Sequence, residues 1–431
     1  MHDELPQSNR IYPQSMLNDT ACIIALPSAS FYVGNSGFSY DDIVASDGDS
    51  ASLTYEKMIS QLRPNNYLNA QVSIPFFMIM RRWGNWQIAF HQAEVLSINV
   101  RYTREMAEFL WYGNSKFIGK EVNLAPDAEL LRYYESALTI ARNVGKWNLG
   151  ASFKYLEGVS CISVQGNKLN VFTEMETYNL SINTDIEIHQ SNTNQLARIG
   201  VFPTSWFKNP GFSLDIGASR SIGEKWRLSS SVTNLGFLRW RRSVKTLRSQ
   251  NRFQFDGLDL SSFVLGDSLN LEDYEDSVMH LLSFTETQGK FTSYTVPRFQ
   301  AGINYLLKPN LKVGVFQQLQ FLNRGTQLSM SSSLIREFDW RAHSLNAGIH
   351  YTYRNRTPFN FGLSIDCRWR FLQFFVMSDN MLSWILPKAR VPLSLFDSKS
   401  EDSIIIPKQL RSINFHFGIN LFLTKQRGIN S

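Results

Sequence analysis

Apolar and polar residues alternate strictly along several long segments of this 431-residue chain. In 344–354 (SLNAGIHYTYR), Leu345, Ala347 and Ile349 fall on one face of an extended strand, and Asn346 and His350 fall on the other. The same period of two runs through 178–189, 360–371 and 412–423. It predicts β-strands with one apolar and one polar face. The runs match the roughly 9–11 residues that a tilted strand needs to cross a bilayer, whereas strands of soluble proteins mostly have about five or six.

The connections between these strands alternate between short and long. Short ones are expected at 82–85, 145–146, 223–225, 308–310 and 355–358, and long ones near 34–66, 101–130, 191–209, 239–296, 324–341 and 378–410. Up-and-down barrels of the outer membrane have this pattern, with the short turns in the periplasm. The first strand (22–33) leads into a long loop and the last (411–424) follows one. Both termini are therefore expected in the periplasm, and the number of strands is expected to be even.

We therefore expect an all-β fold, a transmembrane antiparallel up-and-down β-barrel of about fourteen strands, with twelve as the alternative. The larger number applies if the segment 159–190 holds an extra pair. Residues 22–431 form the barrel and its long loops, while residues 1–21 have no strand pattern and either cap the barrel or enter it. Short loop helices are expected at 51–62 and within 271–282. Soluble sandwiches have shorter strands, and soluble barrels are smaller, with about eight strands.

Three tryptophans each open a strand directly after a tight turn. Trp86 follows Gly84-Asn85, Trp147 follows Gly145-Lys146, and Trp226 follows Gly223-Glu224-Lys225. Tryptophan favours the membrane interface, where its ring lies half in lipid and its N–H reaches water. We expect Trp86, Trp147 and Trp226 to form part of a periplasmic aromatic girdle. The alternative is that tryptophan suits the start of any half-buried strand.

Composition and charge exclude several classes of protein. The mean hydropathy of −0.21 and the lack of an apolar run near the ~18 residues of a transmembrane helix exclude a helical membrane protein. The formal charge of +6 is spread along the chain, so we expect no nucleic-acid partner. The three cysteines, Cys22, Cys161 and Cys367, fit neither a disulfide framework nor a zinc site. We expect no metal and no cofactor.

If the apolar faces meet lipid, the opposite faces line the lumen. The expected lumen-lining charged and histidine residues are Lys154, Asp185, Glu187, Asp215, Arg227, Arg298, Lys312, His350, Arg354, Asp366, Arg368, Arg370 and His416. Both signs of charge are present, which favours a salt-bridged, narrow or plugged interior over an open polar path. An enzyme would need a serine and an oriented histidine within reach. There is no GxSxG motif, and we expect His350 and His416 to be structural and the protein not to be an enzyme.

The connection 239–296 divides into a basic and an acidic half. It opens with RWRRSVKTLR (239–248), and no lysine or arginine occurs between Arg252 and Lys290. The basic part either faces lipopolysaccharide phosphates or pairs with the acidic half. The loop as a whole either packs over the barrel mouth or docks a partner.

Several stretches resemble a family of uncharacterised outer-membrane barrels of Bacteroidota. They are LPQSNRIYPQS (5–15), FYVGNSGFSYDDIV (31–44), EFLWYGNSKFIGKEVNL (108–124), YYESALTIARNVGKWNLGASFKYLEG (133–158) and FDGLDLSSFV (255–264). The resemblance implies a removed signal peptide and a location in the outer membrane of a Gram-negative bacterium. It implies no catalytic residues. More distantly, the chain is similar to fatty-acid-transporter barrels and to the PorV-type barrels of the type 9 secretion system.

Two functions follow as hypotheses. The first is a non-enzymatic accessory or partner subunit of a larger outer-membrane assembly, such as a type 9 secretion translocon, because the loops are elaborate and carry no catalytic constellation. The alternative is a transporter of small hydrophobic or amphipathic ligands, by analogy with the fatty-acid barrels. In both cases outer-membrane lipid and lipopolysaccharide are the immediate partners.

Overall fold

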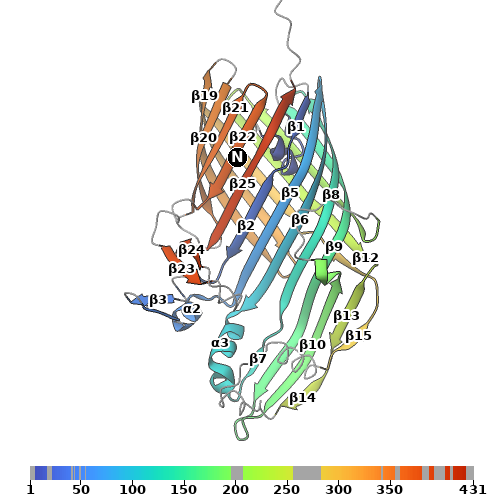
Figure 1. Cartoon of the computed structure of the whole chain (residues 1–431), viewed down its shortest axis with the longest axis vertical. Helices are drawn as coiled ribbons and strands as arrows, with labels where there is room; N and C mark the ends of the chain where they lie inside the picture. The colour runs from blue at the N-terminus through green and yellow to red at the C-terminus, as the bar shows by residue number, and fades with distance from the viewer. Residues whose placement is uncertain are drawn as a thin grey trace, which may run out of the picture.

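The computed structural model describes residues 5–16, 22–39, 42, 44–47, 50–53, 55–195, 207–255, 283–340, 343–354, 360–380, 388–392, 403–407 and 411–423. Within them, a closed antiparallel β-barrel of fourteen strands forms the body of the protein (Figure 1). The prediction of an all-β, fourteen-stranded, up-and-down barrel is confirmed.

The wall follows the order of the chain. Its strands are β1 (Cys22–Ala25) with β2 (Ala29–Asn35), β5 (Asn65–Trp83), β6 (Trp86–Thr103), β8 (Asp127–Val144), β9 (Trp147–Thr173), β11 (Pro210–Ile222), β12 (Trp226–Trp240), β17 (Arg298–Lys308), β18 (Leu311–Leu322), β19 (Gly325–Trp340), β20 (His343–Tyr353), β21 (Phe361–Trp369), β22 (Leu372–Asp379) and β25 (Ser412–Leu423). β1 and β2 together make one wall strand, interrupted at 26–28. The barrel closes because β25 pairs with β22 on one side and with β1 and β2 on the other.

Alternation along the strands separates two surfaces. Apolar side chains such as Phe153, Ile216 and Phe374 point outward and are about half exposed, whereas Ser152, Asp215 and Gln373 on neighbouring positions are buried inside. Because an apolar exterior band and a polar interior suit a lipid environment, the wall has the surface of a transmembrane barrel. No helix in the described ranges is long and apolar enough to cross a membrane.

The two rims differ as predicted, with changes in detail. Short connections at 84–85, 145–146, 223–225, 309–310 and 370–371 share one rim, here called the short-turn rim. The expected long loop 324–341 is instead the wall strand β19, joined to β18 by Asn323 and Arg324. The expected short turn 355–358 lies outside the described residues; β20 ends and β21 begins at the opposite, long-loop rim. The short connections at 323–324 and 370–371 are not expected from the sequence, and the number of wall strands is even, as expected.

The extra pair of strands does not come from 159–190. It comes from β19 and from the division of 360–378 into β21 and β22 at Arg370 and Phe371. The alternating segment 178–189 forms β10 (Leu180–Ser191), which lies outside the wall. There Ile182 and Ile186 are buried against neighbouring strands rather than turned to lipid. Alternation predicts a half-buried strand, but it does not say what covers the apolar face.

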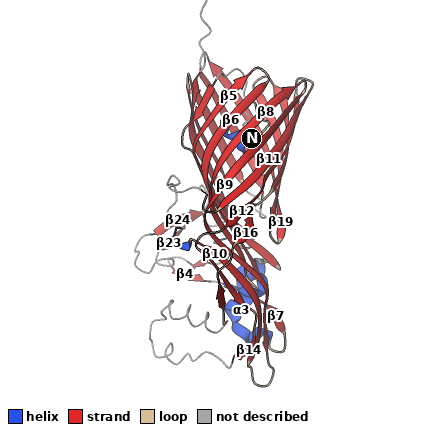
Figure 2. Cartoon of the chain, turned by 90° about the vertical axis from the view of Figure 1, so that its right-hand side faces the viewer, coloured by secondary structure: helices blue, strands red, loops and turns tan. Residues whose placement is uncertain are grey.

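β10 belongs to a sheet that continues the wall beyond the long-loop rim, called here the extension. The second half of β9 carries it, and β10 pairs with β9, with β13 (Val244–Ser249) and with β14 (Arg252–Phe255). β7 (Glu121–Asn123), β15 (Thr285–Thr287) and β16 (Phe291–Tyr294) complete it. Figure 2 shows this sheet projecting past the end of the barrel.

Helices are few and short. The structure has η1 (Pro6–Arg10), α2 (Tyr55–Gln61), α3 (Arg104–Tyr112), η2 (Gly113–Phe117) and η3 (Thr193–Gln195). The side chain of Thr103 caps α3 by accepting a hydrogen bond from the Met106 amide. The helix expected at 51–62 exists as α2, but it starts later, after the hairpin of β3 (Val44–Asp47) and β4 (Ser50–Leu53). A second hairpin joins β23 (Lys388–Pro392) and β24 (Ser403–Pro407). The helix expected within 271–282 lies outside the described residues.

If the outer face contacts lipid, the cost of placing an arginine on it should depend on the depth of the position in the membrane. Phe153 is 56% exposed near mid-wall, and Leu149 is 45% exposed close to the short-turn rim. We expect Phe153→Arg to lower the free energy of unfolding in lipid vesicles by about 2–4 kcal/mol, and Leu149→Arg by about 0–1 kcal/mol. Urea unfolding followed by tryptophan fluorescence measures both. Equal costs at the two depths would contradict a membrane-spanning wall.

Candidate functional site in the barrel lumen

The N-terminal segment lies inside the barrel. Residues 5–16, called here the plug, contain η1, and most of their side chains are buried. The plug is bound to many strands of the wall: Gln7 donates to Asn420 at 2.7 Å, Ser231 donates to the carbonyl of Ile11 at 2.8 Å, and Gln87 donates to the carbonyl of Ser15 at 2.8 Å. Of the two positions expected for residues 1–21, the described part enters the barrel.

Two glycines on the inner wall make room for the plug. A Cβ atom at Gly150 would lie 2.4 Å from the Gln14 nitrogen and from the carbonyl group of Pro13. At Gly217 it would lie 1.9 Å from Oε1 of Gln14. The plug backbone therefore packs directly on β9 at Gly150, where a larger residue would collide with it, and the side chain of Gln14 packs on β11 at Gly217.

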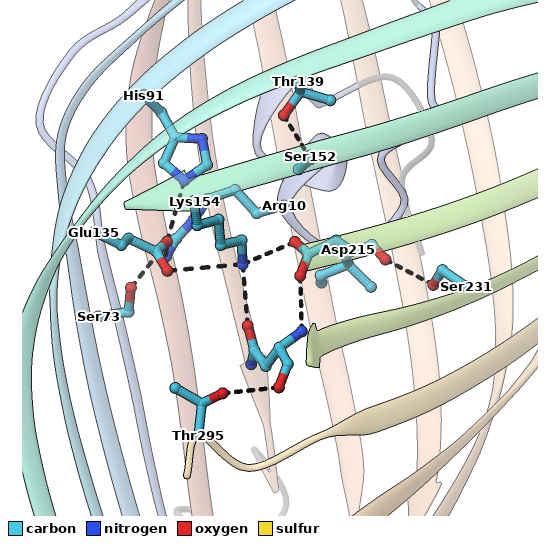
Figure 3. Close-up of polar contacts among 12 residues, drawn as sticks. Arg10, Ser73, His91, Glu135, Thr139, Ser152, Lys154, Asp215, Ser231 and Thr295 are labelled. Atoms are coloured by element: carbon cyan, nitrogen blue, oxygen red, sulfur yellow. Dashed lines mark hydrogen bonds and ion pairs between the residues drawn. The ribbon is translucent and has the colours of Figure 1, made fainter. Parts of the chain in front are cut away.

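Arg10 anchors the plug to a buried network of charges (Figure 3). Its guanidinium donates to Ser73 at 2.9 Å and pairs with Glu135 at 2.6 Å. Glu135 also contacts His91 Nε2 at 3.1 Å and lies 3.7 Å from Lys154 Nζ. Because Glu135 is almost fully buried, these cations and the ring replace the water that would otherwise solvate the carboxylate.

Lys154 links this cluster to a second carboxylate. Its ammonium lies 2.8 Å from Asp215, close enough for an ion pair although outside the angular geometry of a hydrogen bond, and it donates to Asn234 at 3.0 Å. Asp215 has no exposed surface and accepts a hydrogen bond from the backbone amide of Asn234 at 2.7 Å. The network thus joins β8, β9, β11, β12 and the plug into one rigid assembly.

At the other end, the tip of the β18–β19 hairpin (Asn323 and Arg324, called here the hairpin tip) crosses the barrel mouth. These strands stand opposite β5 and β8 in the ring. Nevertheless, Arg324 lies 3.2 Å from Asp127 of β8 and 3.1 Å from Asn167 of β9, and the hydroxyl of Tyr67 on β5 donates to the Arg324 carbonyl at 3.0 Å. The hairpin tip therefore covers the lumen from the long-loop side.

A cavity of about 350 Å³ lies in the lumen between the plug and the hairpin tip. Arg10 and Ile11 of the plug border it at one end, and Gln320 and Ser329, near the hairpin tip, border it at the other. Its wall combines polar with aromatic and sulfur-containing side chains, among them Gln71, Gln300, Gln318, Arg298, Arg354, His350, His416, Phe316, Phe375 and Met377. This size and mixture are typical of small-ligand sites.

Most of the charged residues expected in the lumen do face it. Around the cavity or the network lie Lys154, Asp215, Arg298, His350, Arg354 and His416. Asp366 is buried inside the wall between Asn346 and Gln373, and Arg368 lies 4.0 Å over the ring of Phe422. Arg227 and Lys312 share the inner face near the short-turn rim, where Lys312 lies 3.6 Å from Glu337.

Three of the predicted residues are elsewhere. Asp185 and Glu187 lie on β10 in the extension, where Asp185 accepts a hydrogen bond from Asn167 and Glu187 lies 3.8 Å from His189. Arg370 is exposed in the turn between β21 and β22, with φ of 54°. The period of two does not continue through a turn, and it does not distinguish a wall strand from a strand of the extension.

His350 meets a serine across neighbouring strands. Its Nε2 lies 2.5 Å from Oγ of Ser364. A hydrolase would also need backbone amides free to stabilise an oxyanion. Ser364 sits in the middle of β21, between Gly348 of β20 and Met377 of β22, so the sheet ladders engage the amides around it. The pair is better explained as part of the polar lining. In the described ranges, no group of three metal-ligating side chains is close enough to bind a metal ion.

Trp86, Trp147 and Trp226 lie in a row at the short-turn rim. Each is the first residue of its strand and is 43–47% exposed on the outer face. Arg142 and Arg220 stack over the rings of Trp86 and Trp147 at 4.6 and 5.1 Å, and Tyr305 packs on Trp226 at 4.5 Å. These positions suit an interfacial girdle, which stays a prediction.

The sequence reasoning missed His91, Glu135 and Arg10. The first two fall on the polar face of alternating segments, opposite Phe90 and Leu138, so the period of two could have identified them. Arg10 carries no such signal because the plug is not a strand. In the predicted basic stretch, Lys245 pairs with Glu286 of β15 at 2.7 Å, which supports pairing of the two halves of 239–296 at this point.

The fold and the lumen define a class: a transmembrane β-barrel with an internal plug and a covered cavity. Residues 16–379 match the model described as Family of unknown function (DUF5723), and the chain belongs to that family. No curated protein matches the chain.

Among solved structures, several are similar to this chain along nearly their whole length. The Ralstonia pickettii toluene transporter TbuX has 10% identity and a TM-score of 0.44, with 98% of this chain and 94% of that chain covered. A Pseudomonas aeruginosa FadL homologue has 9% identity and a TM-score of 0.41, with the same coverage. The Pseudomonas putida toluene transporter TodX has 8% identity and a TM-score of 0.38, covering 96% and 92%. These similarities are too low to support a functional argument.

Proposed function

We propose that this protein is a gated transporter of small ligands in the outer membrane of a Gram-negative bacterium. The observation that carries the proposal is the cavity of about 350 Å³ inside the barrel, between the plug and the hairpin tip. A lumen filled only for rigidity would be packed by its own side chains. Here a space of ligand size remains in the lumen, bordered by the plug and by the inner faces of the wall strands.

The orientation follows from the turns. Cys22 of β1 pairs with Leu423 of β25. The start of the first wall strand and the end of the last one therefore both lie at the short-turn rim. Because outer-membrane barrels keep short turns in the periplasm, the plug would face the periplasm and the hairpin tip the cell exterior. A Bacteroidota source and a removed signal peptide stay predictions from the sequence resemblance.

Cross-linking the hairpin tip tests the proposal. In a variant with Cys22, Cys161 and Cys367 replaced by serine, we expect Tyr67→Cys with Arg324→Cys, joined by a bismaleimide with a disulfide spacer, to slow the entry of small sugars into proteoliposomes. Reduction of the spacer should restore entry. The matched control joins Lys245→Cys to Glu286→Cys on the extension and should leave entry unchanged. The proposal fails if entry is absent before cross-linking or is insensitive to it.

The extension favours a second function, that of a partner subunit in an outer-membrane assembly, which was the first hypothesis from the sequence. The extension presents exposed apolar side chains beyond the barrel, including Phe172, Met175 and Tyr178. Such side chains are frequent in protein interfaces. No feature of the described residues points to type 9 secretion in particular. Purification in mild detergent from native membranes, followed by mass spectrometry, would show a stoichiometric partner or a lone barrel.

A further inference from the structure

Among the described residues that line the cavity, arginine and lysine outnumber aspartate and glutamate. Of the cations that line it, Arg10 pairs with Glu135 and Lys154 pairs with Asp215. Arg298 and Arg354 have different surroundings. Within the described residues, neither lies within ion-pair distance of a carboxylate. Asp379, the other carboxylate among the described residues of the lining, accepts a hydrogen bond from Asn414 at 3.1 Å.

The groups that these two arginines contact directly are neutral. Arg298 donates to the amide oxygen of Gln71 across the lumen, and its Nε is buried without a hydrogen-bond partner. Arg354 donates to Ser329 at 3.2 Å and stacks 4.5 Å over the ring of Tyr32. Burying a guanidinium that hydrogen-bonds only to neutral groups is costly, and an anion in the cavity would offset that cost.

The two side chains are placed to act together. Arg298 is in register with Gln320 of β18, which is in register with Gln327 of β19, and Ser329, the partner of Arg354, lies two residues further along β19. Both guanidiniums thus reach the cavity at a similar level. Their contacts Gln71 and Tyr32 are register partners on β5 and β2, so the two positive charges lie close enough to repel each other. An anion between them would relieve this repulsion. The planar fork of arginine suits carboxylate, phosphate and sulfate groups.

The rest of the lining is suited to an apolar body. Phe316, Phe375 and Met377 border the same space, and no cation pairs with them. We propose that the cavity binds organic anions, with the acidic group held by Arg298 and Arg354 and the apolar part against Phe316, Phe375 and Met377. This inference rests on the proposed function, since it names the class of ligand that the gated lumen would carry.

Binding to the purified, folded barrel in a non-ionic detergent tests the proposal. The probe is 2-naphthoate, with 2-naphthylmethanol and 2-naphthylmethylammonium as its neutral and cationic counterparts, followed by fluorescence titration. We expect the anion to bind best. We expect Arg298→Gln and Arg354→Gln each to weaken its binding about tenfold or more, since each removes hydrogen bonds to a charged group. The neutral probe should be little affected.

Lys312→Gln is the matched control, because it removes one inward positive charge outside the cavity lining. Heat-modifiable migration in gels verifies that each variant is folded, and Arg298→Lys and Arg354→Lys should keep part of the binding through their charge. Equal affinity for the three probes, or an unchanged affinity in both glutamine variants, would overturn the proposal. Displacement of naphthoate by millimolar inorganic sulfate alone would overturn the role of the apolar wall. Neither result would contradict the gated entry of sugars. The binding experiment therefore tests the anion site, and the cross-linking experiment tests the transport function.

Discussion

Replacing Lys154 by methionine is expected to lower the free energy of unfolding by about 3–5 kcal/mol, because it leaves a buried carboxylate without its cation. Asp215 has no exposed surface, and Lys154 is the cation paired with it. Methionine fills a similar volume, so the loss reports charge rather than packing. Urea unfolding of the protein refolded into lipid vesicles measures it.

The control for this prediction is the double variant Lys154→Met with Asp215→Asn. It removes both charges, while Glu135 keeps Arg10 at 2.6 Å. We expect the double variant to be more stable than Lys154→Met alone. A double variant that loses the sum of the two single effects would show that the pair does not act as a unit.

Introducing a side chain at Gly150 is expected to displace the plug and raise the entry of small solutes into proteoliposomes. A Cβ atom there would lie 2.4 Å from backbone atoms of Pro13 and Gln14, which cannot move without shifting the plug. Overpacking of this kind costs about 1–3 kcal/mol, as much as one to three of the hydrogen bonds that hold the plug. Swelling rates for Gly150→Val against the unmodified protein measure the effect.

Two further variants make this test specific. At Gly217 the nearest atom is Oε1 of Gln14, the end of a side chain that can rotate away, so Gly217→Ala should open the lumen less. Ala151→Val adds bulk to the next, lipid-facing position of β9 and should leave entry unchanged. In parallel, a thiol reagent that cannot cross the membrane should label Ser8→Cys faster in the Gly150→Val background. Equal rates of solute entry in Gly150→Val and Ala151→Val would contradict the packing of the plug against β9 at Gly150.

Much of the wall could be predicted from the chain because the signal is local. The alternation in 344–354 places Asn346 and His350 inside and Leu345 and Ile349 on the lipid face, and the structure has the same division. The tryptophans after tight turns lie on the outer face at the short-turn rim, while their place in an aromatic girdle stays a prediction. Such patterns depend only on the geometry of a strand, in which successive side chains point to opposite faces.

The sequence-based strand assignments are wrong where the alternation of apolar and polar residues does not decide whether a segment pairs within the barrel wall. Residues 325–340 read as a loop because Ser331, Ser332 and Ser333 interrupt the alternation, yet β18 and β20 pair on both sides and hold them as β19. Conversely, 178–189 alternates well but belongs to the extension. Hydrogen bonding to a neighbouring strand decides these assignments, and a single sequence does not contain that pairing.

The candidate site divides in the same way. The sequence alone determined a closed barrel with an apolar exterior, a charged interior and elaborate loops at one rim, because each of these depends on residue type and a period of two. The tertiary structure alone decided that the plug enters the lumen, that Arg324 reaches Asp127 across the mouth, and that Arg298 and Arg354 share a cavity without a carboxylate partner among the described residues. These contacts join residues far apart in the chain, and burial and distance, which set the energy of each charge, exist only once the barrel has closed.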